Sequence, residues 1–127
     1  MKTILVVDDD AVLVDALRAV LEGEFEVVTA STGEEAVAAI SHRTPDLIIL
    51  DVMMTYPSEG YDLANLLKKT SSTSSIPIVM LTGVDKMTDL RAQLEKTWVQ
   101  CDRFLTKPPD LGELLVTVHE LVAVAKT

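Results

Sequence analysis

The chain has 127 residues, 48% of them hydrophobic, which is enough to form one domain around one core. Its formal net charge of −9 argues against direct binding to nucleic acid, because that affinity depends largely on Lys and Arg neutralising phosphates. No apolar run is long enough to cross a bilayer, and no signal-peptide pattern precedes the first acidic residues. We therefore expect a single cytoplasmic domain over residues 1–127, with no direct contact to nucleic acid or membrane.

A single cysteine, Cys101, excludes an intrachain disulfide. It has no Cys or His neighbour at metal-ligand spacing, so a zinc site is not expected either. We interpret Cys101 as a small core residue of a protein suited to reducing conditions.

The first third of the chain alternates between strand-like and helix-like patterns. Residues 3–8 are a β-branched run that ends in carboxylates, which is typical of a strand buried on both faces. Apolar positions at helical spacing then predict a helix over 10–23. A second strand is expected over 26–30 and a short helix over 34–41.

The clearest buried strand covers residues 46–51, where four aliphatic residues in succession lead to a carboxylate. The remaining elements are expected in this order: a long loop through Gly60, a helix carrying Leu63, Leu66 and Leu67, a flexible loop over 70–75, a strand over 76–82, a helix over 87–98, a strand over 102–106 and a helix over 111–122. Strands that alternate with helices imply right-handed crossovers. The predicted fold class is α/β, a doubly wound five-stranded parallel sheet with five helices.

Polar residues stand at the carboxyl ends of the predicted strands. In an open parallel sheet, ligands bind in the crevice outside these ends. The residues concerned are Asp8 and Asp9 at the end of the first strand, Asp51 at the end of the third, Thr82 at the end of the fourth and Lys107 after the fifth. We expect three carboxylates, a hydroxyl and an ammonium group to meet at this edge.

Three neighbouring carboxylates repel one another, and their burial is costly unless a cation compensates the charge. Oxygen ligands without nearby His or Cys favour Mg²⁺. A carboxylate can accept a phosphoryl group when cations neutralise that group and fixed donors hold its oxygens. The pattern predicts Asp51 as the nucleophile, Lys107 and Mg²⁺ as the cations, and the Thr82 hydroxyl as a donor.

The whole chain resembles the response-regulator receiver domains of two-component signalling. The matching segments are ILVVDDD, TASTGEEAV, PDLIILDVMM, IPIVMLTG and DRFLTKP, in the family's order and near its spacings. The resemblance implies a phosphoacceptor switch that takes a phosphoryl group from a histidine kinase, a phosphotransfer protein or a small phosphodonor. Such a domain is not a classical enzyme, although it catalyses its own phosphorylation and slow dephosphorylation.

By this resemblance Asp51 is the phosphoacceptor, and Asp8 and Asp9 are the acidic pair that holds Mg²⁺ together with Asp51. The backbone carbonyl of Met53 matches the third protein ligand of the metal. The loop after Asp51 departs from the family because it is one residue longer than usual.

The resemblance also assigns the residues that respond to phosphorylation. Thr82 and Lys107 match the two residues that contact the phosphoryl group, and Phe104 matches an aromatic residue that changes rotamer on activation. The Lys107–Pro108 bond matches a cis peptide of the family. A downstream effector protein or domain is then expected on the face formed by the fourth helix, the fifth strand and the fifth helix.

Other classes of function remain open from the residues alone. Residues 8–12 fit the signature of a haloacid dehalogenase-like phosphatase with Asp8 as nucleophile, but no acidic pair follows Lys107 and Asp51 would have no role. A flavodoxin-like module shares the architecture, yet three aspartates would repel an FMN phosphate. A receiver-like domain that binds partners without phosphorylation is the third alternative, although all the acceptor residues are present.

Overall fold

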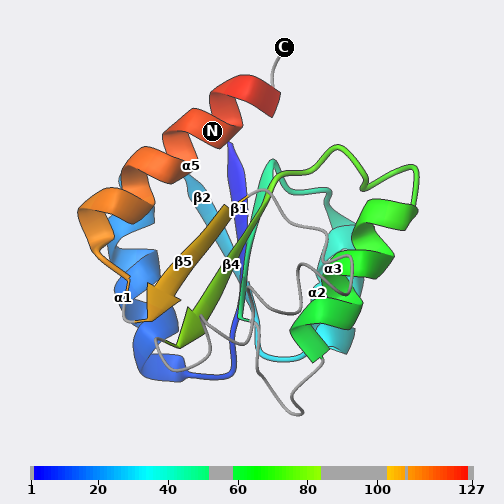
Figure 1. Ribbon diagram of the computed structural model, residues 1–127, viewed down its shortest axis with the longest axis horizontal. Helices are drawn as coiled ribbons and strands as arrows, with labels where there is room; N and C mark the ends of the chain where they lie inside the picture. Colours follow the sequence, from blue (N-terminus) through cyan, green and yellow to red (C-terminus); the bar gives the residue numbers. More distant parts are fainter. Residues whose placement is uncertain (1, 52–58, 84–102, 108, 126–127) are drawn as a thin grey trace.

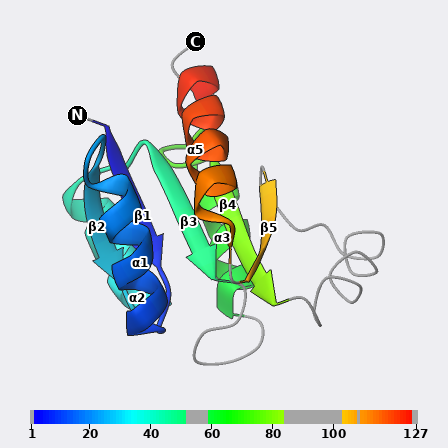
Figure 2. The same ribbon diagram turned by 90° about the vertical axis from the view of Figure 1, so that its left-hand side faces the viewer.

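The computed structural model describes residues 2–51, 59–83, 103–107 and 109–125. Its elements are β1 (Thr3–Val7), α1 (Ala11–Leu21), β2 (Glu26–Ala30), α2 (Gly33–His42), β3 (Leu47–Asp51), α3 (Glu59–Lys69), β4 (Ile78–Gly83), β5 (Arg103–Lys107) and α5 (Leu111–Ala125). The five strands are all parallel and lie in the order β2-β1-β3-β4-β5. Helices α1 and α5 cover one face of the sheet, and α2 and α3 cover the other (Figures 1 and 2). The predicted doubly wound α/β fold is confirmed.

Two predicted features lie outside the described residues, namely the helix expected over 87–98 and the cis peptide at Pro108. Within the described ranges, no helix combines the length and the apolar character that a membrane span requires.

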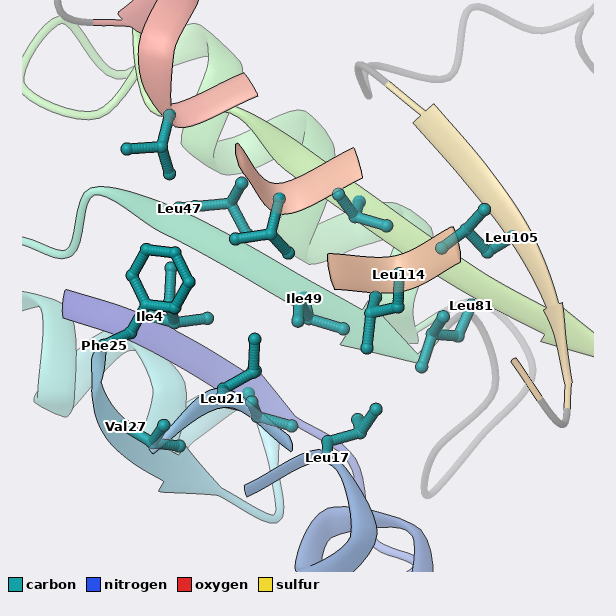
Figure 3. Close-up of a cluster of buried hydrophobic side chains, with 14 residues drawn as sticks. Ile4, Leu17, Leu21, Phe25, Val27, Leu47, Ile49, Leu81, Leu105 and Leu114 are labelled. Atoms are coloured by element: carbon teal, nitrogen blue, oxygen red, sulfur yellow. The ribbon is translucent and has the colours of Figure 1, made fainter. Parts of the chain in front are cut away.

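The central strands are buried on both faces, which explains their almost uninterrupted aliphatic sequences. On β1, Ile4 and Val6 belong to the cluster beneath α1 and α5, whereas Leu5 and Val7 belong to the cluster beneath α2 and α3. Figure 3 shows the first of these clusters, in which Leu17, Leu21 and Phe25 pack with Ile4, Leu47, Ile49, Leu81, Leu105 and Leu114. Two apolar layers therefore hold the sheet in a fixed position.

Side-chain caps set the starts of the first two helices. The carboxylate of Asp10 accepts hydrogen bonds from the N–H groups of Val12 and Leu13, at 3.1 and 3.2 Å. The hydroxyl of Thr32 accepts one from the N–H of Glu35 at 3.0 Å. Such caps satisfy donors that the helix itself leaves unpaired. They also fix the turns that follow β1 and β2 at the carboxyl edge of the sheet.

Several boundaries differ from the predicted ones. Gly60 lies in the first turn of α3 instead of the preceding loop, and Lys107 is the last residue of β5 instead of the residue after it. The extension of β5 has a direct cause, because the parallel pairing with β4 continues to the pair Gly83 and Lys107. Leu66 was expected on the apolar stripe of α3, but 52% of its surface is exposed.

The segment over 70–75 is more ordered than the expected flexible loop. The buried hydroxyl of Thr73 donates to the carbonyl of Leu67 at 2.5 Å. The ammonium group of Lys68 donates to the carbonyl of Ile76 at 2.7 Å. Local side-chain bonds of this kind stabilise turns in Ser- and Thr-rich sequences, so the composition of this segment builds a hydrogen-bonded connection between α3 and β4.

The core packing leads to a first testable prediction. Ile49 is completely buried between the sheet and the α1/α5 layer, so Ile49→Ala should lower the free energy of unfolding by about 2–5 kcal/mol through lost burial and a residual cavity. Urea denaturation measures this change. Val116, which is 57% exposed on α5, provides the control, because Val116→Ala removes little buried surface. Equal losses in the two variants would contradict the assignment of the core.

Candidate functional site

Three carboxylates meet at the carboxyl edge of the sheet. Asp8 follows β1 directly and Asp51 ends β3, and the register places Val7 beside Leu50 on these neighbouring strands. One oxygen atom from each of Asp8, Asp9 and Asp51 lies within 4.8 Å of the other two. Asp8 and Asp51 are 2% and 3% exposed, whereas Asp9 is exposed. The predicted meeting of these three residues is therefore observed.

Three consecutive aspartates occupy three different positions after β1. The N–H of Asp8 donates to the carbonyl of Ala30 at 3.0 Å, which ties this residue to the end of β2. One carboxylate oxygen of Asp8 accepts a hydrogen bond from the N–H of Asp10 at 2.9 Å. Asp10 in turn caps α1, which leaves Asp9 exposed at the mouth of the cluster. The turn thus holds one buried and one exposed carboxylate beside Asp51.

The donor set fits a hard divalent cation. Three negative charges within 4.8 Å of one another, two of them on buried residues, repel strongly unless a cation lies between them. All three side chains offer oxygen atoms, which Mg²⁺ prefers. A site that is open on the Asp9 side also leaves room for water or phosphate oxygens, which Mg²⁺ commonly retains as ligands.

The backbone brings the other predicted residues to the same region. Leu81 pairs with Asp51 across β3 and β4, so Thr82 is the next residue beyond this pair. Thr82 itself pairs with Thr106, and Gly83 pairs with Lys107. Thr82 and Lys107 are therefore placed at the carboxyl edge, as the sequence predicts.

The two other predicted site residues have different outcomes. The backbone of Phe104 lies on β5 beside Met80, two residues before Thr106. Met53 lies outside the described residues. The roles assigned to the side chains of Thr82, Lys107 and Phe104 stay predictions.

One interaction beside the site was not identified from the sequence. A shallow depression of about 250 Å³ next to the acidic cluster is lined in part by Asp9, Arg18, Ser31 and Glu35. One oxygen of Glu35 accepts hydrogen bonds from the backbone N–H of Ser31 at 2.8 Å and from its hydroxyl at 2.9 Å. A capping box of the pattern Thr32-x-x-Glu35 would place Glu35 on the N–H of Thr32, so the sequence indicates a cap here but not the bonds to Ser31.

The hydrogen bonds of Glu35 have a consequence for stability at low pH. The backbone N–H of Ser31, and then its hydroxyl, lower the pKa of Glu35 below the usual value of 4.5. A carboxyl group with a lowered pKa in the folded state adds stability above its unfolded pKa, and this stability is lost as the pH falls through the lowered value.

This linkage leads to a second prediction. We expect the free energy of unfolding to be higher in the parent than in Glu35→Gln at neutral pH, with a difference that shrinks as the pH falls below about 4.5. Denaturant titrations across this pH range measure the difference. Glu34→Gln is a matched control because Glu34 is an exposed acid in the same first turn of α2. A difference that did not change with pH would refute the prediction.

The fold and the acidic cluster define a class of protein: a doubly wound α/β domain with a carboxylate cluster, suited to a cation, at the carboxyl edge of its sheet. Comparison with known families extends this result, because the model of the response regulator receiver domain matches residues 4–119. The chain belongs to the response regulator receiver domain family of two-component systems. This family consists of signalling domains and not of classical enzymes, as the sequence predicted.

Individual relatives agree with this assignment. Over 122 residues the chain is 39% identical to the phosphate regulon transcriptional regulatory protein PhoB of Pseudomonas aeruginosa. This alignment covers 95% of the chain and 52% of PhoB. The chain is 37% identical over 117 residues to the DNA-binding response regulator MtrA of Mycobacterium tuberculosis, with coverage of 91% and 48%. The chain thus spans about half the length of these curated relatives.

A solved structure of similar size gives the same result. The signal receiver domain of a signal transduction histidine kinase from Syntrophus aciditrophicus superposes with a TM-score of 0.85 at 32% sequence identity. The superposition covers 97% of this chain and 91% of that one. The resemblance therefore extends across the domain and is not limited to the motifs.

Proposed function

We propose that this chain is a phosphoacceptor switch in which Asp51 receives the phosphoryl group. The observation that carries the proposal is the position of Asp51, which ends a central strand, is 3% exposed and lies in the cluster with Asp8 and Asp9. A carboxylate oxygen of Asp51 attacks the phosphorus of a phosphohistidine or a small phosphodonor. The bond from phosphorus to the donor atom breaks, and its electron pair leaves with the donor.

Asp8, Asp9 and Asp51, with the backbone carbonyl of Met53, are the proposed ligands of Mg²⁺. When bound, this ion supplies positive charge that compensates both the carboxylates and the phosphoryl oxygens. The Lys107 ammonium group adds a second positive charge from the end of β5. Positive charge from two sides is what phosphoryl transfer to a carboxylate requires, since nucleophile and phosphoryl group are both anionic.

The signal is proposed to leave the site through Thr82 and Phe104. The hydroxyl of Thr82 donates to a phosphoryl oxygen and moves toward it, and the Phe104 ring turns into the space that Thr82 leaves. The surface that changes comprises residues 87–98, β5 and α5. A downstream effector protein or domain binds this surface, while a histidine kinase or phosphotransfer protein supplies the phosphoryl group.

We further propose that residues 1–127 act as one receiver domain without direct contact to nucleic acid. PhoB and MtrA are named as transcriptional or DNA-binding regulators, but the match covers only about half of each. A net charge of −9 on this chain opposes contact with a polyanion. Its output is therefore proposed to be a change of protein surface.

The assignment of the nucleophile gives a third prediction. Asp51→Asn should abolish labelling by acetyl phosphate in the presence of Mg²⁺, because the amide replaces the nucleophilic oxygen and removes one metal ligand. Asp15→Asn is the control, since Asp15 is an exposed acid on α1 outside the cluster, and it should be labelled like the parent. Intact-mass spectrometry and peptide mapping give the readout. Phosphate mapped to Asp8 would support the phosphatase-like alternative instead.

The metal site gives a fourth prediction, which does not depend on phosphorylation. Mg²⁺ that binds only the folded protein raises the free energy of unfolding, by an amount that grows with the Mg²⁺ concentration and with the affinity of the site. We therefore expect Mg²⁺ to raise the urea midpoint of the parent and of Asp15→Asn, and to have a smaller effect on Asp9→Asn. Without Mg²⁺, Asp9→Asn should be more stable than the parent, because one of three repelling charges is gone. Equal responses of Asp9→Asn and the parent to Mg²⁺ would exclude Asp9 as a ligand.

A further inference from the structure

A second hollow lies at the opposite edge of the sheet from the acidic cluster. It has a volume of about 480 Å³ and is lined by residues at the start of β1 and β2 and by the C-terminal half of α2. Its apolar residues are Leu5, Val28, Ala38, Ala39 and Pro45. Small-molecule sites in proteins commonly have volumes of about 300–1,000 Å³ and mainly apolar walls, so this hollow has the size and character of a ligand site.

The hollow has a simple cause in the sequence. Where α2 crosses the edge of the sheet it carries Ala38 and Ala39, whose short side chains do not fill the space above Val28. Val28 remains only partly buried, although it packs against the core on the α2 side of β2. Protein interiors are normally close-packed, with few voids larger than a water molecule. Apolar surface that stays accessible in a concave site is available to bind a ligand.

A hydroxyl group is present in the wall of the same hollow. Thr3 is 2% exposed and lines the cavity. Its backbone N–H donates to a carboxylate oxygen of Asp46 at 2.8 Å. A hydroxyl can both donate and accept a hydrogen bond, so an oxygen atom of a bound molecule can pair with it.

A cationic group stands at the mouth of the hollow. The guanidinium of Arg43 contacts the carboxylate of Glu26 at 2.7 Å, and both side chains are about half exposed. A guanidinium carries five N–H donors in a planar fork, and the bond to Glu26 uses one of them. Arg binds carboxylates through two parallel hydrogen bonds. Arg43 can therefore receive a second carboxylate at the entrance to an apolar cavity.

We propose that this hollow binds a small carboxylic acid with a compact apolar body. The apolar body lies against Leu5, Val28 and Ala39, the carboxylate contacts Arg43, and a ligand oxygen pairs with the Thr3 hydroxyl. This site is separate from the phosphoacceptor site, which lies at the other ends of the same strands. The proposal goes beyond the phosphoacceptor function and does not rest on it.

The fifth prediction tests the site with a defined probe, 6-hydroxynaphthalene-2-carboxylate, in an NMR titration of the whole chain. We expect saturable shifts of backbone amides at the start of β1, the start of β2 and the C-terminal half of α2. The corresponding carboxamide, which is neutral and nearly the same shape, should bind about tenfold more weakly because it lacks the charge-assisted bonds to Arg43. Absence of saturable binding of the carboxylate would overturn the proposal.

Variants separate the cavity from general surface binding. Ala39→Leu should reduce affinity at least about tenfold by filling the hollow, whereas Ala19→Leu, which adds the same side chain at an exposed position of α1, should not. Arg43→Gln should remove the preference for the carboxylate over the carboxamide. Arg103→Gln is its control, because Arg103 also forms a half-exposed ion pair, with Glu120.

Two more variants complete the design. Thr3→Val keeps the shape of the side chain but removes the hydroxyl, so it should weaken probe binding while the fold is retained. Asp51→Asn should bind the probe with parental affinity, which keeps this test independent of phosphorylation. Unchanged affinity in both Ala39→Leu and Arg43→Gln would show that the probe binds elsewhere, and the proposal would then be wrong.

Discussion

Repulsion among three carboxylates at one edge of the sheet is the constraint on which this structure depends. Asp8 and Asp51 are almost completely buried, so water screens their charges poorly. Only a rigid support can hold such groups together, and the two apolar layers on either side of β1 and β3 provide it. The ends of β1 and β3 place the carboxylates side by side, and the packed core keeps the carboxylates from moving apart.

Helix α2 connects the two edges of the molecule. Its N-terminal turn lies beside the acidic cluster, where Thr32 and Glu35 form the cap that orders the end of β2. Its C-terminal half lies over the hollow at the other edge, where alanines leave space above the sheet. One helix therefore combines a tightly hydrogen-bonded start with a loosely packed end. The hollow and the acidic cluster involve different contacts of α2, which is why the two proposed sites can be tested separately.

Much of the fold and of the acidic site could be predicted from the sequence, because both follow from local patterns. Buried parallel strands are short aliphatic runs, and the end of each run places Asp8 and Asp51 at the same edge. The end of β5 was predicted less well, since Lys107 joins the sheet only through pairing with Gly83 on another strand. The exposure of Leu66 likewise depends on neighbouring elements and not on its own helical position. The hollow could not be predicted at all, because it arises where short side chains of α2 lie over Val28 of β2. Such packing between two elements leaves no local pattern in the sequence.

The balance of charge and packing is consistent with the proposed response of this receiver domain to a single phosphoryl group. A site in which buried carboxylates repel one another is less stable than a neutral one, and the surrounding core must offset that cost. A bound cation would reduce the repulsion, and the proposed phosphoryl group on Asp51 would change the charge again at the point where β1, β3 and β4 end side by side. Thr82 lies within β4, one residue beyond the pair of Asp51 and Leu81, and Phe104 lies on the adjacent β5. In the proposed switch the altered charge therefore acts first on these two strands. In that proposal the arrangement of the strands sets the direction in which the signal leaves the site.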